Sequence, residues 1–278
     1  MAYEQILYDV SNGIATITLN RPDKLNAWTG TMEDEVRHAM YAAESDTGAR
    51  VIVLTGAGRG FCAGADMGGL SSTASSTKEP TLEESRERMK GDTPRREGIR
   101  PDFTEKYSYF PSIQKPIIGA INGAAAGLGF VMSLYCDIRF ASDKAKFTTA
   151  FSRRGLIAEH GISWTLQRIV GLPSALDLTL SARVVLADEA LRIGLVNQVY
   201  PADSFMEDVN AYATEMAKMV SPRSTRIMKE QIYNAQFQTL QDAILVANDE
   251  MFASLKCDDF KEGVAHFVEK RAPAFTGK

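Results

Sequence analysis

Histidine, cysteine and tryptophan are scarce in this sequence of 278 residues, which holds three, three and two of them. The cysteines are odd in number and lack the spacing of metal ligands, so we predict reduced thiols, with Cys136 in the core, rather than a disulfide framework. The histidines are scattered along the chain. A zinc site is therefore not expected, and we predict no metal.

Long apolar runs and an excess of positive charge are also missing. No run is long enough to span a bilayer, and the first nine residues do not resemble a signal peptide, so we expect a cytoplasmic protein without a membrane partner. The net charge of −4 gives no reason to expect a nucleic-acid partner. The glycines between 56 and 64 match neither a dinucleotide fingerprint, because Phe61 stands where its last glycine should be, nor a GK[ST] phosphate loop.

The central stretch of the chain is Lys115–Ala141. An apolar run, Ile117–Ile121, is followed by three alanines, by Gly127-Leu128-Gly129 and by a second apolar run, which predicts a strand, a glycine-rich turn and a buried helix. Glycines allow close approach to the backbone, and the unpaired N–H groups of a helix start suit a developing oxyanion. Tight packing of small residues would give the same pattern, so this stretch alone leaves both explanations open.

A second segment, VIVLTGAGRGFCAGADM at 51–67, runs from a buried strand into a loop with four glycines. FCAGADM, INGAAAGLG and CDIRFAS together resemble the crotonase, or enoyl-CoA hydratase/isomerase, superfamily. RPDKLNA, ADEALRIGLVNQV and FKEGVAHFVEKR resemble the same family in the same order, so the resemblance extends from about Ile6 to Arg271. It implies an α/β fold, a spiral of repeated ββα units with a helical C-terminal region that trimerises.

We accordingly divide the chain into a spiral core, 1–200, and a C-terminal helical region, 201–278. Residues 68–101 are rich in serine, threonine and charge and are expected to form a mobile insertion, in which Thr81 and Glu84 could make a capping box. Local patterns predict further elements. They are a hairpin over 6–19, helices at 31–45 and 103–113, a helix from about 162 that stops at Gly171, and later helices from 222, at 240–255 and at 258–270.

Crotonase-type proteins act on acyl-CoA thioesters, and two backbone N–H groups hold the thioester oxygen while negative charge develops on it as an enolate. The resemblance assigns one N–H group to Ala65 in CAGAD and the other to Leu128 in GLG. Family members often have glycine at the second position. Leucine keeps the N–H donor but narrows the space around the thioester.

The acid–base positions depart from the hydratase pattern. The resemblance places the two hydratase glutamates at positions occupied here by Val131 and Phe151, which can neither orient water nor move a proton. Glu159, in GLIAEHG, lies in the loop where the isomerase branch carries its glutamate. An isomerase needs one carboxylate, because the same group removes a proton from C2 and returns it to C4.

The pKa of Glu159 can be predicted in two ways. Desolvation by the neighbouring Ile157, Ala158 and Ile162 would raise it, whereas a place in the first turn of a helix would lower it. His160 could orient the carboxylate or carry a second proton, but a structural role is the interpretation that we favour.

The resemblance also implies residues that contact the CoA portion of the substrate. They lie near the front of the chain and in its last helix: Lys24, Leu25, Ala63, Asp66, Met67, Phe267 and Lys270. The last two would come from a neighbouring subunit of a homotrimer or hexamer. CoA enters as part of the thioester, so no separate cofactor is predicted.

Four functions follow as hypotheses. The first is an enoyl-CoA isomerase of fatty acid metabolism with Glu159 as its single acid–base group, and the second is a hydratase, a lyase, that uses Glu159 and water. The third is an acyl-CoA-binding homologue with little activity. The fourth is another enolate chemistry on the same scaffold, such as a lyase or a thioester hydrolase.

Overall fold

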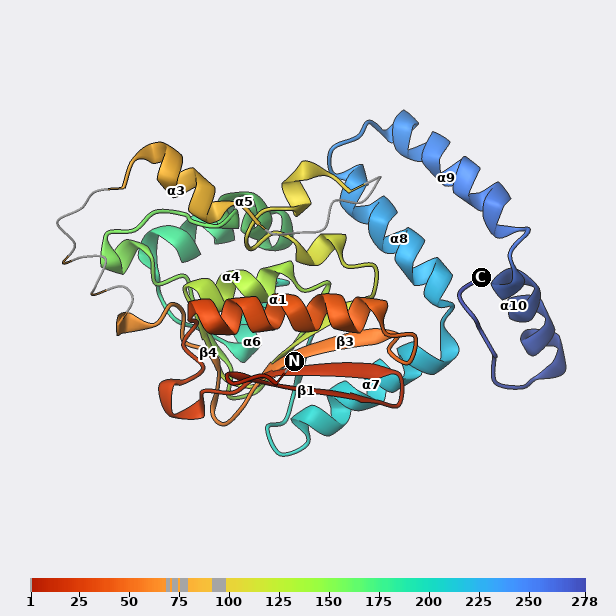
Figure 1. The fold of residues 1–278 in the computed structure, drawn as a ribbon, viewed down its shortest axis with the longest axis horizontal. Coiled ribbons are helices and arrows are strands. Elements are labelled where there is room, and N and C mark those ends of the chain that lie inside the picture. Colours follow the sequence, from red (N-terminus) through yellow and green to blue (C-terminus); the bar gives the residue numbers. More distant parts are fainter. Residues whose placement is uncertain (1, 69–70, 72–74, 76–79, 92–98) are drawn as a thin grey trace.

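The computed structural model describes residues 2–68, 71, 75, 80–91 and 99–278. Within these ranges the larger sheet has six strands in the order β1-β2-β3-β5-β7-β10 (Figure 1). Their bounds are β1 (Ile6–Ser11), β2 (Ile14–Leu19), β3 (Val51–Gly56), β5 (Ile117–Ile121), β7 (Ile138–Ser142) and β10 (Gln198–Tyr200). The predicted hairpin is confirmed, because β1 and β2 pair antiparallel, and the remaining neighbours pair parallel.

The described residues also form a second, smaller sheet of four strands. Its strands, in the order β4-β6-β8-β9, are β4 (Gly60–Cys62), β6 (Ala124–Ala126), β8 (Lys146–Thr148) and β9 (Val185–Leu186). Each of β3, β5 and β7 is followed along the chain by one strand of this sheet. The chain thus repeats a ββα unit, and the loops that leave β4, β6 and β8 emerge side by side because these strands are adjacent and parallel.

Helices cover both faces of the larger sheet. Their bounds are α1 (Gly30–Ser45), α3 (Leu82–Met89), α4 (Leu128–Tyr135), α5 (Ile162–Ser181), α6 (Ala187–Arg192), α7 (Phe205–Met219), α8 (Pro222–Ala235), α9 (Leu240–Ser254) and α10 (Asp258–Glu269), with single 3-10 turns η1 (Pro22–Lys24), η2 (Pro101–Phe103), η3 (Phe110–Ser112) and η4 (Ser152–Arg154). The buried face of α1 and all of α4 join the main core, and α7 packs on the opposite face of the sheet. All six residues of β3 are therefore buried.

Three local predictions need correction. Residues 103–113 do not form the predicted helix: η2 ends at Phe103, bends and turns follow, and η3 comes after them. Tyr109, Phe110 and Ile113 are each buried in the core, and Pro111 interrupts the segment. The alanines after the central strand form β6. Gly171 is non-helical (φ 75°, ψ 160°), as expected of a stop, but the chain resumes a helix that ends at Ser181.

The predicted insertion, 68–101, includes much of what the structure leaves undescribed, and its mobility and the domain division stay predictions. Within it, α3 begins with the expected capping box: the Thr81 hydroxyl accepts from the Glu84 N–H, and the Glu84 carboxylate accepts from the Thr81 N–H. No helix within the described ranges is long and apolar enough to cross a membrane.

The C-terminal helices extend away from the sheets (Figure 1). Ser221 caps α8 and Pro222 is its first residue, as predicted. Lys229 of α8 is almost fully buried and bonds to the carboxylate of Asp137 at 2.7 Å, which ties the helix to the core. By contrast, α9 has no buried residue and α10 has one, Asp259, although both carry many large apolar side chains.

Candidate active site

The Ala65 N–H group is positioned by a short parallel pairing between residues 24–28 and 63–66. Trp28 donates from its N–H to the Gly64 carbonyl at 2.8 Å and accepts from the Asp66 N–H at 2.9 Å, and Ala63 donates to the carbonyl of Leu25. In a parallel pairing of this register, the N–H and C=O of the intervening residue point to the other side. Ala65 therefore directs its N–H away from the Trp28 segment.

The second N–H group belongs to a turn that lies against Gly64. Leu128 is the first residue of α4, and helices leave the N–H groups of their first turn without a partner inside the helix. A Cβ added to Gly64 would lie 3.7 Å from the Leu128 nitrogen and 2.9 Å from the Ala126 carbonyl oxygen, so the two turns are in close contact. Gly64 (φ +98°) and Gly127 (φ +51°) adopt conformations that favour glycine, which explains the glycines at both turns.

A cavity of about 700 Å³ opens beside the two turns. It is lined by Arg21, Lys24, Ala27, Ala63, Gly64, Ala65, Asp66, Met67, Gly68, Tyr107, Gly127, Leu128, Ala150, Phe151, Arg154, Leu156, Glu159 and His160. We call it the reaction cavity. It brings together all three residues predicted to be catalytic, from segments that are 31 to 94 positions apart in the sequence.

Two carboxylates among the described lining residues differ in their electrostatic environment. Asp66 lies 3.0 Å from the Arg21 guanidinium, whose hydrogen bond lowers the pKa of this carboxyl. Burial instead raises the pKa of Glu159 above its usual value. A carboxylate with a raised pKa is the better proton acceptor, so Glu159 is the candidate base of the cavity.

The apolar surroundings of Glu159 differ in part from those predicted. Ile157 is 75% exposed and does not line the cavity, so it is not the residue that desolvates the carboxyl. Leu156, Phe151 and Tyr107 line the cavity instead. Glu159 precedes the first residue of α5 by three positions and so lies outside its first turn; the prediction of a raised pKa holds and that of a lowered one does not.

His160 is held beside the carboxyl group. Its Nε2 atom lies 3.5 Å from Oε2 of Glu159, its ring meets that of Tyr107 edge-on at 4.6 Å, and its carbonyl accepts a hydrogen bond from the Tyr135 hydroxyl. Burial and the nearby Lys106 cation lower the pKa of His160 to about 4. The imidazole is consequently neutral near pH 7, and its backbone adopts a left-handed conformation (φ 54°).

The two hydratase positions contribute no acid–base group. Phe151 lines the reaction cavity, and Val131 is fully buried within α4. Hydrogen bonds to the C-terminal end of α5 hold the residues before Phe151. The Thr148 hydroxyl donates to the Ala182 carbonyl at 3.0 Å, and the Thr149 hydroxyl donates to the Leu178 carbonyl at 2.9 Å. The apolar wall at 150–151 is thereby held in place.

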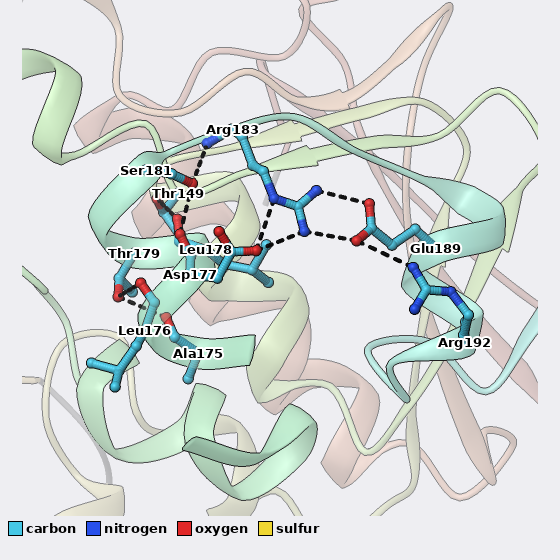
Figure 2. Close-up of polar contacts among 10 residues, drawn as sticks. All are labelled: Thr149, Ala175, Leu176, Asp177, Leu178, Thr179, Ser181, Arg183, Glu189 and Arg192. Atoms are coloured by element: carbon cyan, nitrogen blue, oxygen red, sulfur yellow. Dashed lines mark hydrogen bonds and ion pairs between the residues drawn. The ribbon is translucent and has the colours of Figure 1, made fainter. Parts of the chain in front are cut away.

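An ion-pair network anchors this end of α5 (Figure 2). Arg183 bonds to both oxygens of Glu189 in α6 and also to Asp177 in α5, and Arg192 pairs with the same glutamate. Because these groups are exposed or half-buried, we regard the network as a brace between α5 and α6 and not as a site.

The residues predicted to contact CoA separate into two groups. Lys24, Ala63, Asp66 and Met67 line the reaction cavity. Leu25 does not line the cavity, and its side chain packs near Gly60. Its backbone carbonyl accepts a hydrogen bond from the N–H of Ala63, which does line the cavity. Phe267 lies on α10 and Lys270 directly after it, and Phe267 is 79% exposed. Figure 1 shows α10 at the opposite end of the ribbon from β4, and neither residue lines this cavity.

Sequence patterns did not single out Tyr107, Arg21 or Arg154, which line the cavity. Tyr107 belongs to the segment 103–113, which was expected to be a helix on the pocket wall; Arg21 begins the RPDKLNA motif but had no predicted role, and nothing in the sequence links Arg154 to the site. Tyr107 is held by its hydroxyl, which donates to Glu33 of α1 at 3.0 Å. Among the described residues no group of three or more His, Cys, Asp or Glu side chains could hold a metal ion.

The chain and its fold have counterparts among known proteins. The model of the enoyl-CoA hydratase/isomerase family matches residues 9–278. A protein of Rhodobacter capsulatus named "Probable enoyl-CoA hydratase" is 35% identical, with all of both chains covered, and 1,2-epoxyphenylacetyl-CoA isomerase of Escherichia coli is 34% identical over 99% of each. The solved enoyl-CoA hydratase of Bacillus anthracis is 27% identical, with a TM-score of 0.83 over 99% of this chain and 100% of the other.

The fold and the cavity define an acyl-CoA-processing enzyme with a crotonase fold. The chain belongs to the enoyl-CoA hydratase/isomerase family.

Proposed function

We propose that the protein moves the double bond of a 3-enoyl-CoA to the 2-position, with Glu159 as the single acid–base group. The observation that carries this proposal is that Glu159 shares one cavity with the Ala65 and Leu128 backbone, while Val131 and Phe151 stand at the hydratase positions. The Escherichia coli relative is also named as an isomerase of an acyl-CoA, although its named substrate is an epoxide and not a 3-enoyl thioester.

In the proposed reaction the thioester oxygen accepts hydrogen bonds from the Ala65 and Leu128 N–H groups. Neither N–H group donates to another group among the described residues, so both are free for a substrate. Glu159 takes a proton from C2, the two N–H groups stabilise the dienolate, and the carboxylic acid then returns the proton to C4. Atoms and charge balance without water or a cofactor, and the neutral His160 orients the carboxylate.

The CoA portion of the substrate would lie along the polar end of the reaction cavity, against Lys24, Ala63, Asp66 and Met67. Leu25 would shape this region through its backbone. We further propose that α9 and α10 pack against other subunits of a homotrimer or hexamer, because an apolar surface of this size is seldom left in water. Phe267 and Lys270 could then contact CoA bound to a neighbour.

The test is Glu159→Gln, which keeps the shape of the side chain but removes the base. We expect isomerisation of hex-3-enoyl-CoA to fall at least roughly a hundredfold, while binding of a saturated acyl-CoA is kept. Asp66→Asn is the matched control, since this second carboxylate lines the same cavity beside Arg21, and it should change KM more than kcat.

The same assay separates the other candidate reactions. Hydration of hex-2-enoyl-CoA that depends on Glu159 would replace the isomerase proposal with a hydratase. Tight binding of acyl-CoA with turnover of neither substrate would indicate a binding protein or another enolate chemistry. Isomerisation at the parental rate by Glu159→Gln would refute the role of Glu159.

A further inference from the structure

A second cavity, of about 430 Å³, adjoins the reaction cavity, and half of its lining residues carry rings. The rings belong to Phe103, Tyr107, Tyr135, His160, Trp164 and Phe237. We call it the ring-lined cavity. Tyr107 and His160 line both cavities, so this ring pair forms the junction between them.

One wall of the ring-lined cavity consists of two stacked rings. Trp164 of α5 and Phe237, beyond the end of α8, stack nearly parallel, with an interplanar angle of 12° and ring centroids 5.3 Å apart. The Arg168 guanidinium lies 3.9 Å from the centre of the Trp164 ring, and that of Arg100 lies at the same distance from the centre of the Phe237 ring. The two cations cover the outer faces of the stack and fix it in place, so its ring edges are left to meet another ring edge-to-face.

Two of the charged residues on the lining are engaged, and the third, Glu105, is exposed to solvent. Lys106 lies 3.2 Å from the Glu33 carboxylate, and Asp102 accepts a hydrogen bond from Arg100 at 3.0 Å. A charged acyl end would have to compete with these ion pairs. The lining therefore suits an uncharged group, and the cavity is larger than the roughly 150 Å³ in which an apolar protein cavity holds benzene.

We infer that the ring-lined cavity receives the end of the acyl group and that the enzyme prefers thioesters whose acyl chain ends in an aryl ring. This inference rests on the proposed function. An acyl group held at Ala65 and Leu128 passes Glu159 and meets next the junction formed by Tyr107 and His160. A short alkyl end leaves the rings of this cavity uncontacted, whereas an aryl end meets their edges.

The experiment compares 5-phenylpent-3-enoyl-CoA with hex-3-enoyl-CoA, which carry the same double bond. For the parental enzyme we expect kcat/KM to be about tenfold higher for the aryl substrate. Phe237→Ala removes one ring of the wall, is 37% exposed in the parental chain and lies outside the reaction cavity, so it should abolish this preference and leave the alkyl substrate unchanged.

Two further variants sharpen the test. Ser108→Trp adds bulk to the ring-lined cavity and should also slow only the aryl substrate. Phe252→Ala removes an exposed ring of α9 that lines neither cavity, and the ratio between the substrates should stay at its parental value.

The outcomes distinguish the two proposals. If hex-3-enoyl-CoA is isomerised but the parental enzyme shows no aryl preference, or if Phe237→Ala keeps it, the inference is overturned while the proposed function stands. If neither substrate is isomerised, the proposed function fails, and the cavity is tested by the affinities of the saturated 5-phenylpentanoyl-CoA and hexanoyl-CoA. Equal affinities would then overturn the inference, and tighter aryl binding that Phe237→Ala loses would support it.

Discussion

Nε2 of His160 lies 3.5 Å from Oε2 of Glu159, and burial favours the neutral form of both groups. The pKa of the glutamic acid is raised and that of the histidine is lowered to about 4, so the two groups do not form an ion pair near pH 7. A neutral imidazole can orient the carboxylate without holding it in the charged form. This leaves Glu159 free to be protonated during a reaction cycle.

The pH dependence of the reaction follows from these directions. Glu159 must be deprotonated to act as a base, so kcat/KM should fall as the pH falls through its pKa, which lies above the usual 4.5. His160 titrates lower, near pH 4, and should not cause this loss. We expect an acidic limb with a slope of one proton, measured with hex-3-enoyl-CoA between pH 4 and 8.

The variant His160→Gln serves as the control for this profile. The acidic limb should remain, with its midpoint displaced, because Glu159 keeps its burial but loses a polar neighbour. Disappearance of the limb in His160→Gln would mean that the histidine, and not the glutamate, is the titrating group.

The backbone donor of Leu128 can be removed without breaking the helix that it begins. Leu128 is the first residue of α4, where proline is well tolerated, so Leu128→Pro should fold. Loss of the N–H should lower kcat roughly a hundredfold, about 3 kcal/mol of transition-state stabilisation.

The matched variant Leu128→Gly keeps the N–H and removes only the side chain. It should retain most of the activity, and any loss should affect KM more than kcat. Circular dichroism checks that both variants fold. Equal rates for the proline and glycine variants would show that this donor takes no part.

The buried ion pair of α8 should dominate the attachment of the C-terminal helices. The side chains of Lys229 and Asp137 are 8% and 15% exposed, and Lys229 also donates to the carbonyls of Phe110 and Lys115. Lys229→Met would leave a buried carboxylate without its cation, and we expect the free energy of unfolding to fall by about 3 kcal/mol or more in urea at pH 7.

The comparison for this prediction is Lys261→Met on α10. Lys261 pairs with Asp258 at 2.8 Å, but both side chains are more than two-thirds exposed, so its removal should leave the unfolding midpoint unchanged. A similar small effect at Lys229 would show that the Ile117 N–H and the Tyr233 hydroxyl alone satisfy Asp137 and that other contacts hold α8 in place.

Local sequence was enough to predict the elements whose causes are local. The Asn12-Gly13 turn sets the hairpin, and Ser221 with Pro222 starts α8, because turn and capping preferences involve neighbouring residues only. The glycines at 64 and 127 indicated turns that approach something closely, and the structure places these turns against each other. Motif order then identified the family.

Side-chain environments could not be read in the same way. Ile157 was expected to desolvate Glu159 but faces solvent, and Tyr107, 52 positions earlier than Glu159, takes that place because its hydroxyl is held by Glu33 of α1. Residues 103–113 form turns because their aromatic rings enter the core one by one.

The sequence by itself determined which groups are available: two glycine-rich turns, one carboxylate in the loop before α5, and apolar residues at the two hydratase positions. Only the tertiary structure decided that these groups share a cavity, that the pKa of Glu159 is raised, and that a wall of stacked rings lies beyond it. The physical reason is that burial and ring stacking depend on segments that the chain brings together from positions far apart, whereas turns and caps depend on adjacent residues.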